Sequence, residues 1–180
     1  MFTGQWSPPG VCCDTYMSSG LCFFIRLNTH ERMGTMGKVV VKPEVCIGCH
    51  LCEVWCAVAH SKSKNIIKAF LYEDTKPLPR ITVEENLPLT FAWQCRHCQE
   101  PDCVTACISG ALTKNPVSGH VEHDSLKCVG CYSCVLICPY GCILIDEQKR
   151  EIIKCDLCAG LETKYCVSHC PNEALIYVEN

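Results

Sequence analysis

Two segments in which apolar and polar residues alternate predict strands near the two ends of the cysteine-rich part of the chain: GKVVVKPEV before Cys46 and ALIYVEN after Pro171. Between them, residues 108–127 predict a short helix end, a strand, a turn at 115–119 and a second strand around Val121. A different pattern fills residues 128–145, which are eighteen residues without a charge. That length alone would be enough for a membrane span.

A membrane span over residues 128–145 is nevertheless not predicted. Gly130, Pro139 and Gly141 interrupt a helix there, and four of the residues are cysteines that are better explained as ligands. Apolar residues around a metal cluster exclude water and tune its potential, so the lack of charge has its own reason. We therefore expect a protein with no direct membrane span.

Composition narrows the classes of function. The chain has 180 residues and a formal net charge of -3, which gives no support for a nucleic-acid partner. Cysteine accounts for 20 residues, a level that in a short secreted chain would indicate a disulfide scaffold. The first residues have no positively charged leader, no twin-arginine pair and an apolar run of only 21–25, which is too short for a signal core. A cytoplasmic location is expected, where thiols stay reduced and clustered cysteines more often hold metal.

Most of the cysteines form four blocks of four. The first and third blocks are spaced C-x2-C-x2-C-x3-C, the second C-x2-C-x4-C-x3-C and the fourth C-x2-C-x7-C-x3-C. Their members are, in order, Cys46, Cys49, Cys52 and Cys56; Cys95, Cys98, Cys103 and Cys107; Cys128, Cys131, Cys134 and Cys138; and Cys155, Cys158, Cys166 and Cys170. Pro139 and Pro171 follow the last cysteine of the third and fourth blocks.

This spacing indicates iron–sulfur chemistry. C-x2-C-x2-C-x3-C-P is the bacterial ferredoxin pattern for a [4Fe-4S] cluster, and soft thiolates suit iron with sulfide. Three cysteines would wrap a loop around one cluster, and the fourth would begin a helix and point to another. Gly48 and Gly130 would let the loop backbone approach the cluster, and the proline would turn the chain away. Zinc is the alternative metal, because C-x2-C pairs also build structural zinc sites, but the third and fourth cysteines would have no use there.

Spacing also indicates which blocks act together, because the fourth cysteine of each block in a two-cluster ferredoxin ligates the other cluster. The twenty residues between the second and third blocks suit a small ferredoxin, whereas the thirty-eight between the first and second are too many. The predicted terminal strands would lie side by side if the first block pairs with the fourth. The fold class is therefore α+β, two ferredoxin-like [4Fe-4S] units, one inserted in the other. Sequential pairing, first with second and third with fourth, stays open.

The predicted parts are a first ferredoxin-like unit over residues 36–60 and 150–180, a linking segment over 61–92, and an inserted unit over 93–149. The leader over 1–35 has a composition that matches nothing later. We expect it to be unstructured or not translated, with the start at Met33 or Met36. A redox-active or partner-binding tail is the alternative.

The four blocks, with the widened gap in QCRHCQEPDCVTAC and the x7 gap of the fourth block, resemble the four-cluster electron-transfer subunits attached to molybdenum or tungsten oxidoreductases, hydrogenases and carbon monoxide dehydrogenase. CEVWCAVAHS, from Cys52 onward, is most similar to the iron–sulfur subunit of carbon monoxide dehydrogenase and the small subunits of formate hydrogenlyase. The resemblance covers about residues 38–180. It implies an electron-transfer subunit that is not itself an enzyme and a catalytic partner of the carbon monoxide dehydrogenase, formate dehydrogenase, hydrogenase or aldehyde oxidoreductase type, in general a tungsten or molybdenum enzyme.

The resemblance also implies four [4Fe-4S] clusters with nested ligation. We refer to the first set of ligands as Cys46, Cys49, Cys52 and Cys170; the second as Cys155, Cys158, Cys166 and Cys56; the third as Cys95, Cys98, Cys103 and Cys138; and the fourth as Cys128, Cys131, Cys134 and Cys107. Ala57 and Ile108 stand where the other blocks have proline, which weakens the turn but removes no ligand. A diffusible polyferredoxin and a self-associating, electron-conducting filament are the alternative functions.

The remaining candidates lie next to the blocks or outside them. Cys12, Cys13, Cys22 and Cys142 belong to no block, and Cys142 is interpreted as a small buried apolar residue. Three cations adjoin block cysteines, where they would either offset cluster charge or be ordinary solvated charges: Arg96, Lys127 and Lys154. His60 and His97 would hydrogen-bond to a cluster or lie on the surface, and Trp93 would pack between the two units. No phosphate loop, nucleotide fingerprint or Ser/His/Asp set is visible.

Overall fold

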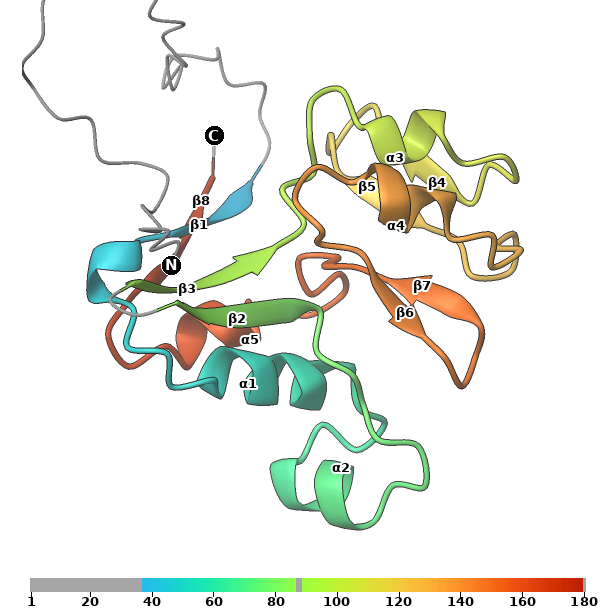
Figure 1. The fold of residues 1–180 in the computed structure, drawn as a ribbon. Helices are drawn as coiled ribbons and strands as arrows, with labels where there is room; N and C mark the ends of the chain where they lie inside the picture. Colours follow the sequence, from blue (N-terminus) through green and yellow to red (C-terminus); the bar gives the residue numbers. More distant parts are fainter. Residues whose placement is uncertain (1–36, 87–88, 180) are drawn as a thin grey trace, which may run out of the picture. The chain divides into compact units, whose positions relative to one another are not determined.

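The computed structural model of the protein describes residues 37–86 and 89–179. The leader predicted over 1–35, with Cys12, Cys13 and Cys22, lies outside the described residues. The elements are β1 (Lys38–Val41), η1 (Pro43–Val45), α1 (Leu51–His60), α2 (Ile66–Leu71), β2 (Ile81–Asn86), β3 (Leu89–Gln94), α3 (Asp102–Thr105), β4 (Leu112–Lys114), β5 (Val121–His123), α4 (Ser133–Ile137), β6 (Leu144–Asp146), β7 (Glu151–Ile153), α5 (Tyr165–Ser168) and β8 (Leu175–Val178) (Figure 1).

The terminal strands pair with each other. β1 and β8 are antiparallel, with Lys38 opposite Val178 and Val41 opposite Leu175. The amide of Lys42 extends the pairing by donating to the Ala174 carbonyl oxygen at 2.7 Å. The prediction that these two alternating segments lie side by side is confirmed, and the pairing joins the chain before the first block to the chain after the fourth.

Two short hairpins follow the second and third blocks. β4 pairs with β5, and β6 pairs with β7, both antiparallel. The side chain of Asn115 accepts hydrogen bonds from the amides of Val117 and Ser118, at 2.8 and 3.1 Å, and so closes the turn before β5. The strand, turn and strand predicted within residues 108–127 are confirmed.

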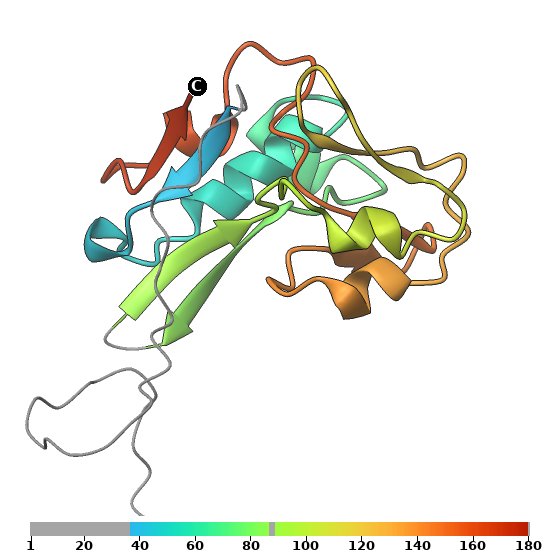
Figure 2. The same cartoon turned by 90° about the horizontal axis from the view of Figure 1, so that it is seen from above.

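A longer hairpin, β2 with β3, was not predicted. It lies within and beyond the segment that was expected only to link the two units, and β3 continues past residue 92. Ile81 and Val83 alternate with more exposed Thr82 and Glu84, so one face of β2 is apolar. β2 lies along α1, where the amide of Val83 donates to Glu53 at 2.7 Å (Figures 1 and 2).

Two small hydrophobic cores hold the chain together, and both contain block cysteines. One is built from β2, β3, α1, α5 and β8 and consists of Cys52, Cys56, Ile81, Val83, Ala92, Cys166 and Leu175. The other lies among the two short hairpins and α4 and consists of Leu112, Val121, Cys134, Ile143 and Ile152. The first core therefore combines residues of the first and fourth blocks, and the second core carries a cysteine of the third.

The helices begin earlier than predicted. α1 contains both Cys52 and Cys56, and α4 starts directly before Cys134, so the third cysteine opens the helix rather than the fourth. Four residues of helix advance about 6 Å along the axis. Two cysteines that were predicted to serve different sites are thus separated by about one helical turn.

In the described part of the chain, no helix is long and apolar enough to cross a membrane. The uncharged segment 128–145 contains only the five-residue helix α4, loops and most of β6.

Candidate metal centres

The loop between the first two cysteines has the same backbone feature in all four blocks. Two residues after the first cysteine the chain takes a positive φ, at Gly48 (65°), His97 (48°), Gly130 (66°) and Leu157 (56°). Such left-handed residues turn successive amides toward one side and make anion-binding concavities, as in many iron–sulfur sites. Glycine adopts this backbone without cost, whereas His97 and Leu157 are held in it by burial, at 2% and 4% exposure.

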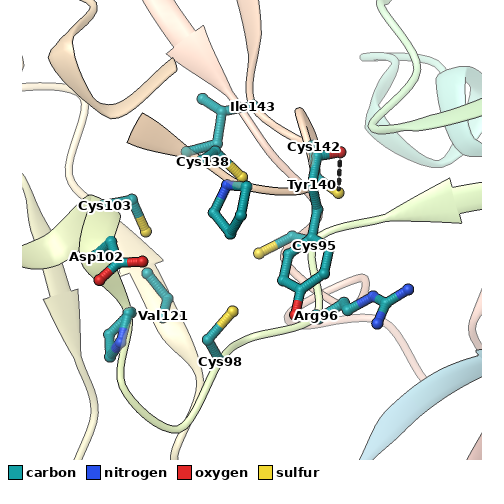
Figure 3. A pocket seen from close by; sticks show the side chains of 12 residues that line it. Cys95, Arg96, Cys98, Asp102, Cys103, Val121, Cys138, Tyr140, Cys142 and Ile143 are labelled. Atoms are coloured by element: carbon teal, nitrogen blue, oxygen red, sulfur yellow. Dashed lines mark hydrogen bonds between the residues drawn. The ribbon is translucent and has the colours of Figure 1, made fainter. Parts of the chain in front are cut away.

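The cysteines of the third set surround one hollow. Cys95, Cys98 and Cys103 come from the second block and Cys138 from the third, and together they line a space of about 390 Å³. Figure 3 shows their sulfur atoms around this common space. The structure thus brings together four cysteines of two different blocks, at a place where Pro139 and Ile143 supply apolar walls.

Two further hollows repeat this composition. The first set, with three cysteines of the first block and Cys170 of the fourth, lines a space of about 350 Å³. The fourth set, with three cysteines of the third block and Cys107 of the second, lines one of about 300 Å³. In each hollow, one block supplies three sulfurs and another block supplies the fourth.

The second set lies largely in the interior. Cys56, Cys158 and Cys166 are buried and Cys155 is half-buried. Burial raises the pKa of Cys166, and its neighbours Cys155, Cys56 and Cys158 raise that pKa further. Burial likewise raises the pKa of Cys56 and of Cys155 to about 12, so these thiols are protonated at neutral pH unless a metal replaces the proton.

Backbone amides point at sulfur in three of the four sets. The amides of Arg80 and Ala174 lie 3.2 Å from the sulfurs of Cys56 and Cys170. Those of Leu112 and Leu157 lie 3.4 Å from the sulfurs of Cys107 and Cys155. Amide donors of this kind stabilise thiolate and tune the potential of an iron–sulfur cluster.

The donor set fits a cluster better than a single ion. Over residues 37–86 and 89–179, no group of three or more His, Cys, Asp or Glu side chains is close enough together to hold one metal ion. A structural zinc would need four ligands about 2.3 Å from one point. The cysteines instead line open hollows in groups drawn from two different blocks, which suits [4Fe-4S] clusters.

Beside the second set, hydrogen bonds connect three parts of the chain through the side chains of His60, Arg80 and Asp156. Asp156 accepts from His60 Nε2 at 3.1 Å and from Arg80 Nη1 at 2.5 Å. His60 Nδ1 also donates to the carbonyl oxygen of Cys56 at 2.7 Å. Although burial raises the pKa of Asp156, the hydrogen bond from His60 and the charge of Arg80 lower it by more, so the net pKa is well below its usual range. His60 thus contacts the backbone of a block cysteine and an acidic partner.

The three cations next to block cysteines differ in their surroundings. Arg96 lies 4.3 Å from the centre of the Tyr140 ring. Lys127 is 62% exposed and pairs with Asp124 at 3.2 Å, so it is the ordinary solvated charge that the sequence left open. Lys154 is 3% exposed and donates from Nζ to the Cys155 carbonyl oxygen at 2.9 Å, so it is not solvated.

His97 is buried rather than on the surface. Its Nδ1 accepts a hydrogen bond from the Val121 amide at 3.0 Å, and its ring lies 5.1 Å from that of His120. Burial first of all, together with the charge of Lys154, lowers the pKa of His97 to about 3. His97 is therefore neutral at physiological pH.

Cys142 lies beside the third set. It is buried, as predicted, but it also lines the same hollow as the four cysteines of that set. Its thiol donates to the Tyr140 carbonyl oxygen at 3.3 Å (Figure 3), and burial raises its pKa to about 12. The sequence feature that could have indicated its place beside the third set is its spacing, four residues after Cys138.

Trp93 packs where β3 meets the loop that follows Cys138. A Cβ atom at Gly141 would lie 3.0 Å from the Trp93 ring, so the ring rests directly on this glycine. Trp93 therefore joins the hairpin of the first core to the segment after the third block, in agreement with the predicted packing role.

The chain is similar in sequence to known iron–sulfur proteins. The 4Fe-4S dicluster domain family matches residues 88–180. The electron transport protein HydN of Escherichia coli (strain K12) is 33% identical over 157 residues, which cover 78% of this chain and 87% of HydN. The beta subunit of NADH-dependent phenylglyoxylate dehydrogenase of Aromatoleum evansii is 35% identical over 144 residues, 78% of this chain and 30% of that subunit. AegA of E. coli (strain K12) is 34% identical over 145 residues, and the chain spans only 21% of its length.

Proposed function

The chain belongs to the 4Fe-4S dicluster domain family and is an electron-transfer protein, and we propose that it carries electrons one at a time through four [4Fe-4S] clusters between a catalytic redox subunit and another electron carrier. One observation carries this proposal: three separate hollows are each lined by four block cysteines, three from one block and one from another. The bond-making chemistry belongs to the partner, and this chain supplies ligands, amide donors and an apolar surrounding.

We assign the ligands as the four sets defined above, with the fourth cysteine of each block serving its neighbour's cluster. The antiparallel pairing of β1 with β8 and the mixed composition of the hollows support this nested assignment over sequential pairing. The corresponding parts are a first unit over 36–60 and 150–180, a linking segment over 61–92 and an inserted unit over 93–149. The β2–β3 hairpin packs into the core of the first unit, so the linking segment also has a structural role.

The order of the sites along the path is first, second, third and fourth. Cys52 and Cys56, about one helical turn apart on α1, would bring the first and second sites together. Within the inserted unit, Cys134 and Cys138 flank the body of α4 in the same way. Electron tunnelling falls steeply with distance, so this spacing favours transfer between neighbours.

Both ends of the proposed path reach the surface. Cys49 of the first set and Cys131 of the fourth set are exposed, whereas the second set is largely buried. Large apolar side chains are exposed beside them, among them Ile47 next to Cys49 and Val129 next to Cys131. Exposed apolar residues at both ends suit docking of electron donors and acceptors.

The partner we propose is a catalytic subunit of the carbon monoxide dehydrogenase, formate dehydrogenase, hydrogenase or tungsten or molybdenum oxidoreductase type. The relative in A. evansii is named as a subunit of a dehydrogenase, which supports a catalytic partner in general. A cytoplasmic location is proposed from the use of cysteine as reduced ligand.

Anaerobic affinity purification of the protein from its own cells, followed by iron and sulfide analysis and mass spectrometry of bound proteins, tests the proposal. Four clusters predict about sixteen iron and sixteen sulfide per chain. A stoichiometric oxidoreductase would identify the partner. About eight iron would contradict the four ligand sets, and a protein that carries sixteen iron but no partner after gentle purification would instead support the diffusible polyferredoxin.

A further inference from the structure

Lys154 is a buried lysine without an acidic partner. It follows β7, is 3% exposed, and its Nζ donates to the carbonyl oxygen of Cys155 at 2.9 Å. The two carboxylates nearest in sequence are engaged elsewhere: Asp156 with Arg80 and His60, and Glu151 with Lys149. Among the residues that the structure describes, none of the ion pairs within 4.0 Å includes Lys154.

The lysine lies beside the second ligand set. It directly precedes Cys155 of that set in the chain and contacts its backbone. Three other members of the set are buried: Cys56, Cys158 and Cys166. The ammonium group is therefore held in the interior next to a member of this set.

An ammonium group in a protein interior is unfavourable unless negative charge compensates it. A carbonyl oxygen gives one hydrogen bond but no formal charge. Asp156, the acidic residue nearest in sequence, is already paired with His60 and Arg80. A cluster held by the four thiolates of the second set would carry negative charge beside the lysine.

We propose that Lys154 is the counter-charge of the second cluster and that it raises the reduction potential of this cluster relative to the potential it would have without the lysine. This inference rests on the ligand sets of the proposed function. Each reduction adds one electron, and one negative charge, to a cluster, while no bond to the lysine forms or breaks. A fixed cation nearby stabilises the reduced form, so electrons are favoured at the second cluster.

The chain offers a matched control, because Lys127 directly precedes the first cysteine of the third block just as Lys154 precedes that of the fourth. Lys127 is 62% exposed and paired with Asp124. We compare Lys154→Met, Lys154→Arg and Lys127→Met in the full chain, purified anaerobically with its clusters. The readouts are iron content and a redox titration monitored by electron paramagnetic resonance.

For Lys154→Met we expect the equilibrium constant for one-electron reduction to fall about tenfold at one of the four clusters, which is a shift of about 59 mV to lower potential. Lys154→Arg keeps the charge and should keep all four potentials within about threefold of the native equilibrium constants. Lys127→Met should do the same, because solvent screens an exposed charge.

The proposal is overturned if Lys154→Met leaves every potential unchanged, or if Lys154→Arg shifts them as much as Lys154→Met does. Should Lys154→Met fail to retain iron, Lys154→Arg decides: sixteen iron with native potentials supports the counter-charge, and the same loss of iron refutes it. A native iron content of about eight would contradict the ligand sets themselves. Sixteen iron with unshifted potentials would refute the role of Lys154 alone.

Discussion

Gly48 and Gly130 occupy the same place in the first and third blocks, yet we expect alanine to be tolerated at only one of them. Both have a φ near 65°. A Cβ at Gly48 would meet nothing closer than 3.4 Å, whereas a Cβ at Gly130 would lie 2.5 Å from the backbone carbonyl oxygen of Arg150. The pair therefore separates the cost of the left-handed backbone from the cost of a close approach.

The expected magnitudes follow from these two terms. Alanine in the left-handed region costs about 1–2 kcal/mol, and the stiffer unfolded chain returns about 0.4–1 kcal/mol. Gly48→Ala should therefore destabilise by about 0–1.6 kcal/mol. Gly130→Ala must also displace the Arg150 backbone, and forcing extra volume into a packed place adds about 1–3 kcal/mol, for a total of about 1–4.6 kcal/mol.

The assay is the guanidinium midpoint of each anaerobically purified variant, followed by far-ultraviolet circular dichroism, together with iron content. Gly160→Ala serves as a control, because its φ is 79° and a Cβ there would meet no atom within 4 Å. We expect Gly48→Ala and Gly160→Ala to behave alike. Gly130→Ala should show a clearly lower midpoint and lose about four iron, the content of the fourth site. Equal midpoints for all three variants would refute the reasoning.

Two other predictions concern the second and third sets. Cys142→Ser should leave iron near sixteen per chain, since the third set is complete without it, and a loss of about four iron would show that Cys142 is a ligand. Asp156→Asn should lower stability at neutral pH by about 1 kcal/mol, a modest value because the Asp156 side chain is one-third exposed. Since the folded pKa of Asp156 lies below its ordinary value, its contribution is present above about pH 4 and declines as the pH falls further, so the stability of wild type and Asp156→Asn should converge only in acid. A difference that is largest in acid would contradict this assignment.

Local rules explain why much of the site was predictable. The first cysteines of a block, with two residues between them, can reach a common centre whatever the rest of the fold does, so the blocks and their number could be found from spacing. The strands at 38–41 and 175–178 show the alternation of a half-buried strand, and their pairing followed once the first and fourth blocks were taken together. The turn at Asn115 was likewise encoded by its own side chain.

What the sequence did not reveal depends on tertiary surroundings. Lys127 and Lys154 have the same relation to a following cysteine, and only the packing around β7 buries one of them. His97 and Leu157 take the backbone that glycine takes in the other blocks, because burial offsets the strain. The β2–β3 hairpin was not predicted because the alternation that marks its buried face, at Ile81 and Val83, is short and lies among prolines and charges.

The pairing of β1 with β8 also constrains the order in which parts of the chain can fold during synthesis. Val41 meets Leu175 only after nearly the whole chain has left the ribosome, although Cys46 and its block emerge early. The ribosome adds about 5–20 residues per second, so roughly 6–26 s pass between the synthesis of Cys46 and that of Leu175. All cysteines of the inserted unit are synthesised before β8, so its two centres can be loaded first. Over this interval the thiols of the first block face oxidants and stray metal without the cysteine of the fourth block that is proposed to complete their set.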